Sequence, residues 1–202
     1  MINVCVNCGE YKADKDVGVE RSVVICPLCS YAHPFRFLPL FFVCGASGTG
    51  KSTLTNHLLH QFDEVVLLDA DILWRPEFNT PGDSYRDFFE TWLRLAKNIA
   101  QSGKPVVILG AGCTPPNVEP CVERRYFADV HYLALVCEDD VVAERLRKRP
   151  SWRNTQDDAF IQGQIKFNHW LKAEPAITCL DTGKHSIEDC REMVKEWIRP
   201  YL

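Results

Sequence analysis

Short apolar runs alternate along the chain with segments in which apolar residues recur every three or four positions. The short runs are typical of buried strands, and they occupy residues 39–44, 65–68, 106–109, 130–136 and 177–180. The segments between them predict amphipathic helices. Strands that alternate with helices are typical of a parallel sheet covered on both faces. The pattern therefore predicts an α/β domain with a five-stranded parallel sheet.

Three of the predicted helices have recognisable start signals. The first begins near Gly50, and the last begins after Ser186, which would cap it. The middle one begins after Ser84, with Asp87 three residues later as the second half of a cap. This helix carries an apolar stripe that we assign to the core rather than to a platform for stacking bases, and its members are Tyr85, Phe88, Phe89, Trp92, Leu93, Ala96 and Ile99.

A glycine-rich loop, residues 45–52, lies between the first strand and the first helix and matches G-x-x-x-x-G-K-[ST] completely. Its glycines let consecutive backbone N–H groups point at one anion, and the helix adds its positive end. Lys51 can reach the β- and γ-phosphates, and the Ser52 hydroxyl suits Mg²⁺. The strand before and the helix after disfavour a plain turn. We assign nucleotide binding to Gly45, Ala46, Ser47, Gly48, Thr49, Gly50, Lys51, Ser52 and Thr53.

The composition is that of an ordinary globular protein. The chain has 202 residues, is 46% hydrophobic and 25% charged, and carries a net charge of −4. This charge gives no general attraction to nucleic acid or to membranes. No apolar run approaches the roughly 20 residues that span a bilayer, and the first residues lack a signal-peptide pattern. We therefore expect a cytoplasmic protein that binds neither a membrane nor nucleic acid.

Four of the ten cysteines form two C-x-x-C pairs that are separated by 17 residues. This spacing is typical of a zinc ribbon, in which four thiolates hold a structural Zn²⁺ with no open position. The ligands would be Cys5, Cys8, Cys26 and Cys29. The alternative is two disulfides, which a reducing compartment disfavours. The other cysteines have no ligand spacing, and we expect most of them to be small buried hydrophobes.

Prolines between Pro34 and Pro39 divide the chain into a ribbon, residues 1–37, and a larger domain, residues 38–202. A segment as short as the ribbon cannot hold a core alone, so the metal would supply much of its folding energy. Its charges balance, whereas a ribbon that grips phosphate backbones is usually basic. We therefore interpret it as a structural module or a contact for a protein partner, and His33 as a surface or hinge residue.

Polar residues follow the predicted strands at the sheet edge where ligands bind. Asp69 and Asp71 follow the second strand, where a carboxylate can deprotonate a hydroxyl or hold Mg²⁺ through water. The alternative is that Asp71 only caps the next helix. Trp74 and Arg75 either contact the acceptor or are exposed without function, and Gly112 lies in the loop after the third strand. That loop has no acidic residue, so carboxylate help for Mg²⁺ must come from the second strand.

A basic cluster lies further along the chain, where Arg145, Arg149 and Arg153 recur every four residues. Pro150 is expected to break the helix, which would put Arg153 on the following loop. Guanidinium groups match the planar oxygens of a phosphoryl group in transfer. The alternative is a solvated basic face.

From about Leu38 to Leu202 the chain resembles the P-loop kinases of the adenylate kinase, gluconate kinase and chloramphenicol phosphotransferase group. The resemblance rests on the phosphate loop, the acidic end of the second strand, Asp140-x₄-Arg145-x₃-Arg149, and Leu180-Asp181-Thr182 before a closing amphipathic helix. It implies a three-layer α/β kinase fold that uses ATP and Mg²⁺. The zinc ribbon is outside the usual pattern of these families.

The resemblance also implies roles for single residues. Arg145 would stack on adenine, and Arg149 would reach the ATP phosphates. The turn at Asp181 and Thr182 would sit at the edge of the base. Asp71 would take the place of the aspartate that engages the acceptor hydroxyl in the small-molecule kinases.

The chain departs from adenylate kinase in two ways. Only a short lid separates Pro150 from Asp158, and the Asp-Gly-x-Pro-Arg run after the third strand is absent. Both departures favour an alcohol over a nucleoside monophosphate as acceptor, such as a hydroxyl of a nucleoside, sugar or antibiotic.

The sequence predicts an ATP-dependent kinase that transfers the γ-phosphate to a hydroxyl, or a phosphate, of a small acceptor, with a nucleoside or nucleotide favoured. One alternative is a polynucleotide 5′-hydroxyl kinase whose ribbon helps to hold the nucleic acid. Another is a non-catalytic nucleotide-binding module that docks a protein partner through its ribbon. The predicted catalytic residues are Lys51, Asp71, Arg149 and Arg153, and the predicted acceptor site comprises Asp69, Asp71, Trp74, Arg75 and Gly112.

Overall fold

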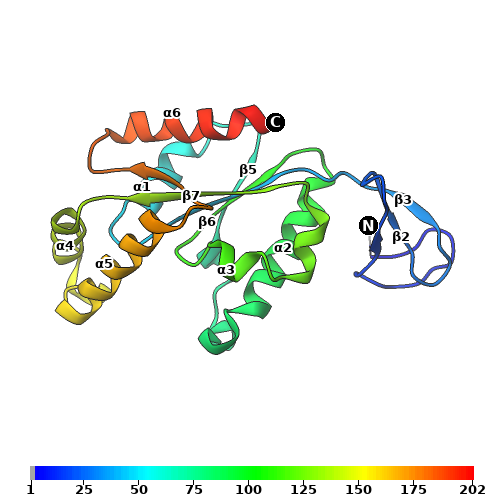
Figure 1. Ribbon diagram of the computed structural model, residues 1–202, viewed down its shortest axis with the longest axis horizontal. Helices are drawn as coiled ribbons and strands as arrows, with labels where there is room; N and C mark the ends of the chain where they lie inside the picture. The colour runs from blue at the N-terminus through cyan, green and yellow to red at the C-terminus, as the bar shows by residue number, and fades with distance from the viewer. Residues whose placement is uncertain (1–2) are drawn as a thin grey trace.

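The computed structural model describes residues 3–202 (Figure 1). A small three-stranded antiparallel sheet comes first, in the order β1-β2-β3, with strands β1 Asp16–Val17, β2 Val23–Ile25 and β3 Ala32–Pro34. A five-stranded parallel sheet follows, in the order β5-β6-β4-β7-β8, with strands β4 Leu40–Gly45, β5 Val66–Asp69, β6 Val106–Leu109, β7 Val130–Val136 and β8 Thr178–Asp181. The predicted α/β fold class is confirmed. Residues 1 and 2 of the predicted ribbon lie outside the described residues.

Helices cover both faces of the large sheet, which makes three layers. Leu54 of α1 and Val194 of α6 pack on one face, and Trp92 of α2 and Leu171 of α5 pack on the other. No helix in the described part of the chain is long and apolar enough to span a bilayer. The helices are α1 Lys51–Leu58, α2 Arg86–Ala100, α3 Pro115–Val118, α4 Asp139–Arg147, α5 Asp158–Ala173 and α6 Ile187–Ile198.

The predicted strands agree with the observed ones to within a residue. Runs 106–109 and 130–136 coincide with β6 and β7, and the other three strands begin and end one residue later than predicted. These three strands end one residue later because Gly45, Asp69 and Asp181 still pair with the neighbouring strands. Apolar runs mark which residues are buried, whereas backbone pairing continues to the polar residue at the strand end.

The predicted cap of α2 is wrong. The helix begins at Arg86, and neither Ser84 nor Tyr85 caps it with its side chain. A short 3₁₀ helix, η3 Pro81–Asp83, comes directly before, and Ser84 ends it in the left-handed conformation. The backbone conformation of Ser84 is therefore set by the end of η3 and does not suit a residue that caps α2. In contrast, Ser186 and Asp189 form the complete capping box of α6.

Tyr126 holds the ribbon against the larger domain. Its hydroxyl donates to the backbone oxygen of Lys15 at 2.6 Å and accepts from the backbone N–H of Lys15 at 2.8 Å. Its ring packs in a small apolar cluster with Val24 and Phe35. These contacts join the ribbon to the larger domain. Whether the two parts fold as separate units divided at residue 37 therefore stays a prediction.

The ribbon and the phosphate loop lie at opposite ends of the parallel sheet. The chain leaves the ribbon and enters β4 at Leu40, whereas the phosphate loop follows β4 at its other end, after Gly45. Figure 1 shows the small sheet at one end of the molecule and helices α4 and α5 at the other. The ribbon therefore does not line the edge of the sheet where the predicted active site lies.

One expectation about a single residue needs correction, whereas the expectation that most of the other cysteines are buried is confirmed. His33 is not a surface or hinge residue, because it belongs to β3 and is only 9% exposed. It faces the same side of the small sheet as its partner Val24, which is fully buried. Cys179 is exposed on β8, at the edge of the large sheet, whereas Cys44, Cys113, Cys121, Cys137 and Cys190 are buried as expected.

Candidate active site

The phosphate loop runs from the end of β4 into the first turn of α1 and depends on glycine for its shape. Gly45 has φ 153°, and an added Cβ there would lie 2.8 Å from the backbone oxygen of Leu135. Gly50 has φ 102° and precedes the helix. Side chains at these positions would meet either backbone strain or the neighbouring strand. The loop conformation that exposes successive N–H groups is therefore encoded by these glycines.

The Lys51 side chain folds back onto the start of this loop. Its ammonium donates to the backbone oxygens of Gly45 at 2.6 Å and Ala46 at 3.0 Å. Burial lowers the pKa of Lys51 to about 8, and among its weaker influences Arg149 lowers that pKa while Asp71 raises it. The ammonium therefore lies within electrostatic reach of one cation and one anion from other elements. The sequence analysis named each of these three residues as catalytic but did not predict their positions relative to one another.

Gln164 is a residue of the site that the sequence analysis missed. Its side-chain oxygen accepts the backbone N–H of Ser47 at 2.7 Å. Gln164 comes from α5, more than a hundred residues away in the chain, so no local motif marks it. The contact fixes the tip of the phosphate loop against α5.

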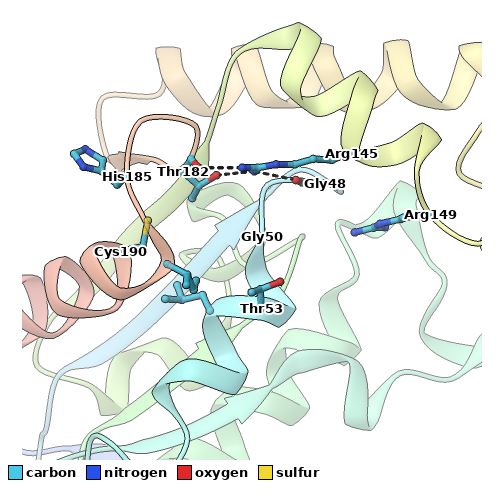
Figure 2. Close-up of a pocket in the computed structure, with 10 residues that line it drawn as sticks. Gly48, Gly50, Thr53, Arg145, Arg149, Thr182, His185 and Cys190 are labelled. Atoms are coloured by element: carbon cyan, nitrogen blue, oxygen red, sulfur yellow. Dashed lines mark hydrogen bonds between the residues drawn. The ribbon is translucent and has the colours of Figure 1, made fainter.

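A cavity of about 370 Å³ opens beside the phosphate loop (Figure 2). Its size suits a nucleoside portion of a nucleotide. The predicted residues Gly48, Gly50, Thr53, Arg145, Arg149 and Thr182 line it. Residues around the start of α6 also line the cavity, and the sequence analysis assigned none of them to the nucleotide site because only tertiary packing brings them there: His185, Ile187 and Cys190.

Arg145 ties the cavity wall to the phosphate loop. Its guanidinium donates to the hydroxyl and the backbone oxygen of Thr182, each at 3.0 Å, and to the backbone oxygen of Gly48 at 3.4 Å. The Thr182 hydroxyl in turn donates to the backbone oxygen of Thr49. Asp181 does not line the cavity, since its carboxylate accepts the N–H of Gly183 and pairs with a lysine.

The other two arginines lie beyond α4, which ends at Arg147. Arg149 lines the nucleotide cavity, and Figure 2 shows it apart from Arg145. Arg153 lies in the 3₁₀ helix η5 Ser151–Arg153, with its guanidinium 4.9 Å from the ring centre of Trp152. Burial, and then the charge of Arg153, lower the pKa of Arg149. The expected break of the helix before Arg153 is confirmed.

Asp69 and Asp71 differ in what they contact. Asp69 is the last residue of β5, and its carboxylate accepts the backbone N–H of Asp71 at 2.9 Å. Asp69 is therefore the cap of the 3₁₀ helix η1 Ala70–Leu73, and the alternative that Asp71 caps this helix is wrong. Burial and the neighbouring Asp69 raise the pKa of Asp71, and Lys51 opposes them. The Asp71 carboxylate therefore lies within electrostatic reach of Lys51 and does not cap η1.

Trp74 and Gly112 are linked through the start of α2. The Trp74 ring is 45% exposed and packs edge-on against Phe88, with 5.3 Å between ring centres. Gly112 faces the neighbouring Phe89, which an added Cβ would meet at 3.5 Å. Arg75 differs, because its guanidinium lies 4.7 Å from the ring centre of Phe78. The aromatic residues at the start of α2, which we assigned to the core, thus also pack against residues of the predicted acceptor site.

The oxygen donors of the site fit Mg²⁺ as the partner of ATP. Ser52 is exposed in the first turn of α1, and Asp69 and Asp71 lie at and just after the end of β5, which β6 separates from β4. Mg²⁺ binds hydroxyl, carboxylate and water oxygens, so these residues could hold it together with nucleotide phosphates. The metal would neutralise charge on the phosphates.

The four predicted zinc ligands lie together in the ribbon. The sulfurs of Cys5, Cys8, Cys26 and Cys29 all lie within 4.8 Å of one another. The side-chain N–H of Asn7 donates to the Cys29 sulfur at 3.5 Å. Four thiolates at this spacing fit a tetrahedral Zn²⁺ site, which would stabilise the fold of the ribbon.

The purified protein is expected to carry about one Zn²⁺ per chain, because four thiolate ligands saturate the tetrahedral ion. Elemental analysis of reduced protein measures this ratio, and Cys5→Ser with Cys26→Ser should abolish it. Cys179→Ser is the matched control, since Cys179 is an exposed cysteine outside the cluster. Metal-free protein with Cys5–Cys8 or Cys26–Cys29 disulfides would contradict the zinc site.

Several solved structures of small P-loop proteins resemble the chain. A sugar kinase from Janibacter sp. HTCC2649 shares 22% identity over 80% of this chain and 95% of its own, with a TM-score of 0.61. The tunicamycin resistance protein of Deinococcus radiodurans shares 17% identity over 80% and 95%, with a TM-score of 0.60. A gluconokinase from Sinorhizobium meliloti 1021 shares 20% identity over 78% and 89%, with a TM-score of 0.53. These similarities establish a shared fold.

A search of curated proteins found no match to the sequence. A family model described as an AAA domain matches residues 40–165, which is more than half of the chain. The match begins with β4 and contains the phosphate loop, both aspartates and the three arginines. The chain therefore belongs to this AAA-domain family, and its larger domain has the fold of the P-loop kinases.

Proposed function

We propose that this protein is an ATP-dependent kinase that transfers the γ-phosphate to a hydroxyl of a small acceptor. The observation that carries the proposal is the phosphate loop with its buried Lys51, whose pKa is influenced by Arg149 and Asp71 from other elements. A cation on the phosphate loop, a carboxylate opposite it and a second cation are the groups that phosphoryl transfer requires.

Each part of the site has a role in this reaction. The N–H groups of the loop and Lys51 hold the phosphates, while Arg145 and Thr182 border the nucleoside. Arg149, with Arg153 beside it, would neutralise the charge that spreads over the γ-phosphoryl oxygens. Mg²⁺, held through Ser52 and through water by Asp69, would share this task.

Asp71 would act on the acceptor. Its carboxylate accepts the proton of the acceptor hydroxyl, the oxygen forms a bond to the γ-phosphorus, and the bond to the β-phosphate oxygen breaks to leave ADP. A raised pKa makes Asp71 a stronger base than an ordinary aspartate. Because Asp69 caps η1, the Asp71 carboxylate is available for this role, which supports the assignment.

A nucleoside or another small ring-bearing alcohol fits the acceptor side best. Trp74 follows Asp71 in the same segment and offers a half-exposed apolar surface, and η5 is too short to enclose a large substrate. Similar structures described as a sugar kinase and a gluconokinase support an alcohol acceptor. The ribbon lies at the far end of the sheet, which disfavours a role for it in holding a polynucleotide acceptor.

ADP formation in the presence and absence of candidate acceptors tests the proposal. Nucleosides, sugars and nucleoside monophosphates should be offered separately, each with Mg²⁺ and ATP. We expect at least one hydroxyl acceptor to stimulate ADP formation well above the acceptor-free rate. Tight ATP binding without stimulation by any acceptor would instead favour a non-catalytic nucleotide-binding module.

ATP affinity is expected to weaken above about pH 8, because Lys51, whose pKa burial lowers to about 8, loses its charge there. Above this pKa the free protein must take up a proton to restore the ammonium that binds phosphate. The dissociation constant should therefore rise by up to about tenfold per pH unit. Calorimetry in buffers of different ionisation enthalpy should detect this proton uptake. A flat dissociation constant without proton uptake would contradict it.

A further inference from the structure

A groove of about 760 Å³ lies between the ribbon and the C-terminal end of α2. Its aromatic side chains come from Tyr31, His33 and Phe35, and Arg36 and Gln101 contribute polar groups. None of the described residues that line it is acidic. Figure 1 shows the ribbon strands at the opposite end of the molecule from α4, so this groove is distinct from the nucleotide site.

The groove follows a free strand edge. β3 is the outer strand of the small sheet and pairs only with β2 in the described part of the chain. The Tyr31 oxygen accepts from the Cys26 N–H, and the Phe35 N–H donates to Ser22, so odd-numbered residues of this segment pair with β2. In an antiparallel pair the alternate residues direct their backbone groups away from the partner. Ala32 and Pro34 therefore present theirs outward.

Gln101 indicates what this edge can bind. Its side-chain oxygen accepts the backbone N–H of Arg36 at 2.9 Å, and its side-chain N–H donates to the backbone oxygen of Arg36 at 3.0 Å. This is the pair of hydrogen bonds that a neighbouring strand would make at the next outward residue. Gln101 ends the open edge at Arg36, while the N–H and carbonyl of Ala32 and the carbonyl of Pro34 stay available.

Side chains around the groove point to a ligand with apolar and acidic groups. Val6, which lies between Cys5 and Cys8 in the sequence, is 77% exposed and lines the groove together with Tyr31, which is 40% exposed. His33 is 9% exposed, and its Nε2 has no hydrogen-bond partner in the described chain. Arg36 is exposed and forms no ion pair with any described residue. Buried polar groups without partners are rare unless a ligand or water satisfies them.

We propose that this groove binds an extended polypeptide segment with alternating apolar and acidic residues, added as a strand to β3. Backbone bonds to Ala32 and Pro34 would supply affinity, as in other cases of strand addition. Alternate side chains would meet the aromatic surface of Tyr31 and Phe35, and the carboxylates between them would lie near Arg36. This binding does not depend on the proposed kinase activity.

A fluorescent peptide of alternating valine and glutamate, about six residues long and blocked at both ends, tests the proposal. Anisotropy with the full reduced chain should show saturable binding, and a valine–lysine peptide should bind at least about tenfold more weakly. Ala32→Pro removes one outward N–H without touching the bonds to β2 and should weaken binding by about tenfold. Ala32→Ser is the matched control and should bind like the parent chain.

Arg36→Glu keeps the backbone contacts of Gln101 and should reverse the preference between the two peptides, so the test survives if Ala32→Pro fails to fold. Thermal unfolding and ATP affinity report folding. Undiminished binding to folded Ala32→Pro, or equal binding of both peptides, would overturn the proposal. So would a single-stranded oligonucleotide that binds this groove while neither peptide does.

Discussion

Replacing Lys51 by alanine is expected to reduce phosphotransfer by about 10³-fold. The Lys51 ammonium is the only charge that the phosphate loop itself supplies. No neighbouring side chain can replace it, because Arg149 and Arg145 approach from other elements and line the nucleoside cavity. The measurement is turnover at saturating acceptor, with ATP binding followed separately.

The fold should survive this substitution. Burial lowers the pKa of Lys51, which means that the folded state disfavours its charge. Removing the ammonium therefore relieves a desolvation cost and takes away only two bonds to loop carbonyls. Lys104→Ala is the matched control, since Lys104 is an exposed lysine bonded to the backbone of Asp63. Full turnover in the Lys51 variant would end the phosphate-loop assignment.

Asp71→Asn should lower turnover by about 10² to 10⁴, the usual contribution of a general base. The amide keeps the size of the side chain but cannot accept the acceptor proton. ATP affinity should barely change, because Asp71 would contact the acceptor and does not line the nucleotide cavity. Stability should change little, since the helix cap at this place is Asp69.

The pH profile separates a base from a merely structural aspartate. Burial raises the pKa of Asp71 above the ordinary 3.8, so turnover should fall in acid at a higher pH than an unperturbed carboxylate would cause. Asp71→Asn should remove this acid limb, and Glu77→Gln, an exposed change in the same segment, should retain it. If Asp71→Asn retains full turnover, the acceptor site must be sought around Arg75 and Gly112.

The fold and the phosphate loop could be predicted because their signals are local. The glycines of the loop, the two cysteine pairs and the apolar runs each specify a structure within a few residues. The α/β sheet and the thiolate cluster are confirmed on that basis. Even the break at Pro150 follows from the chemistry of one residue.

Other features depended on contacts that no local pattern encodes. Gln164 reaches the phosphate loop from α5, and His185 reaches the cavity from the turn before α6. Asp69 caps η1 and Asp71 does not, and this difference follows from the direction of the chain after β5. Ser84 does not cap α2, because the turn before it determines its backbone conformation. These are consequences of tertiary packing, which overrides local preference.

Label transfer from γ-labelled ATP tests the central claim most directly. The full chain with Mg²⁺ would be offered a nucleoside, a nucleoside monophosphate, a sugar and a single-stranded oligonucleotide with a free 5′-hydroxyl, and each product would be separated and identified. We expect the label on a hydroxyl of a small acceptor, with the nucleoside favoured, and its loss in Asp71→Asn. Label found only on the oligonucleotide, or on no acceptor although ATP binds, would contradict a small-molecule kinase.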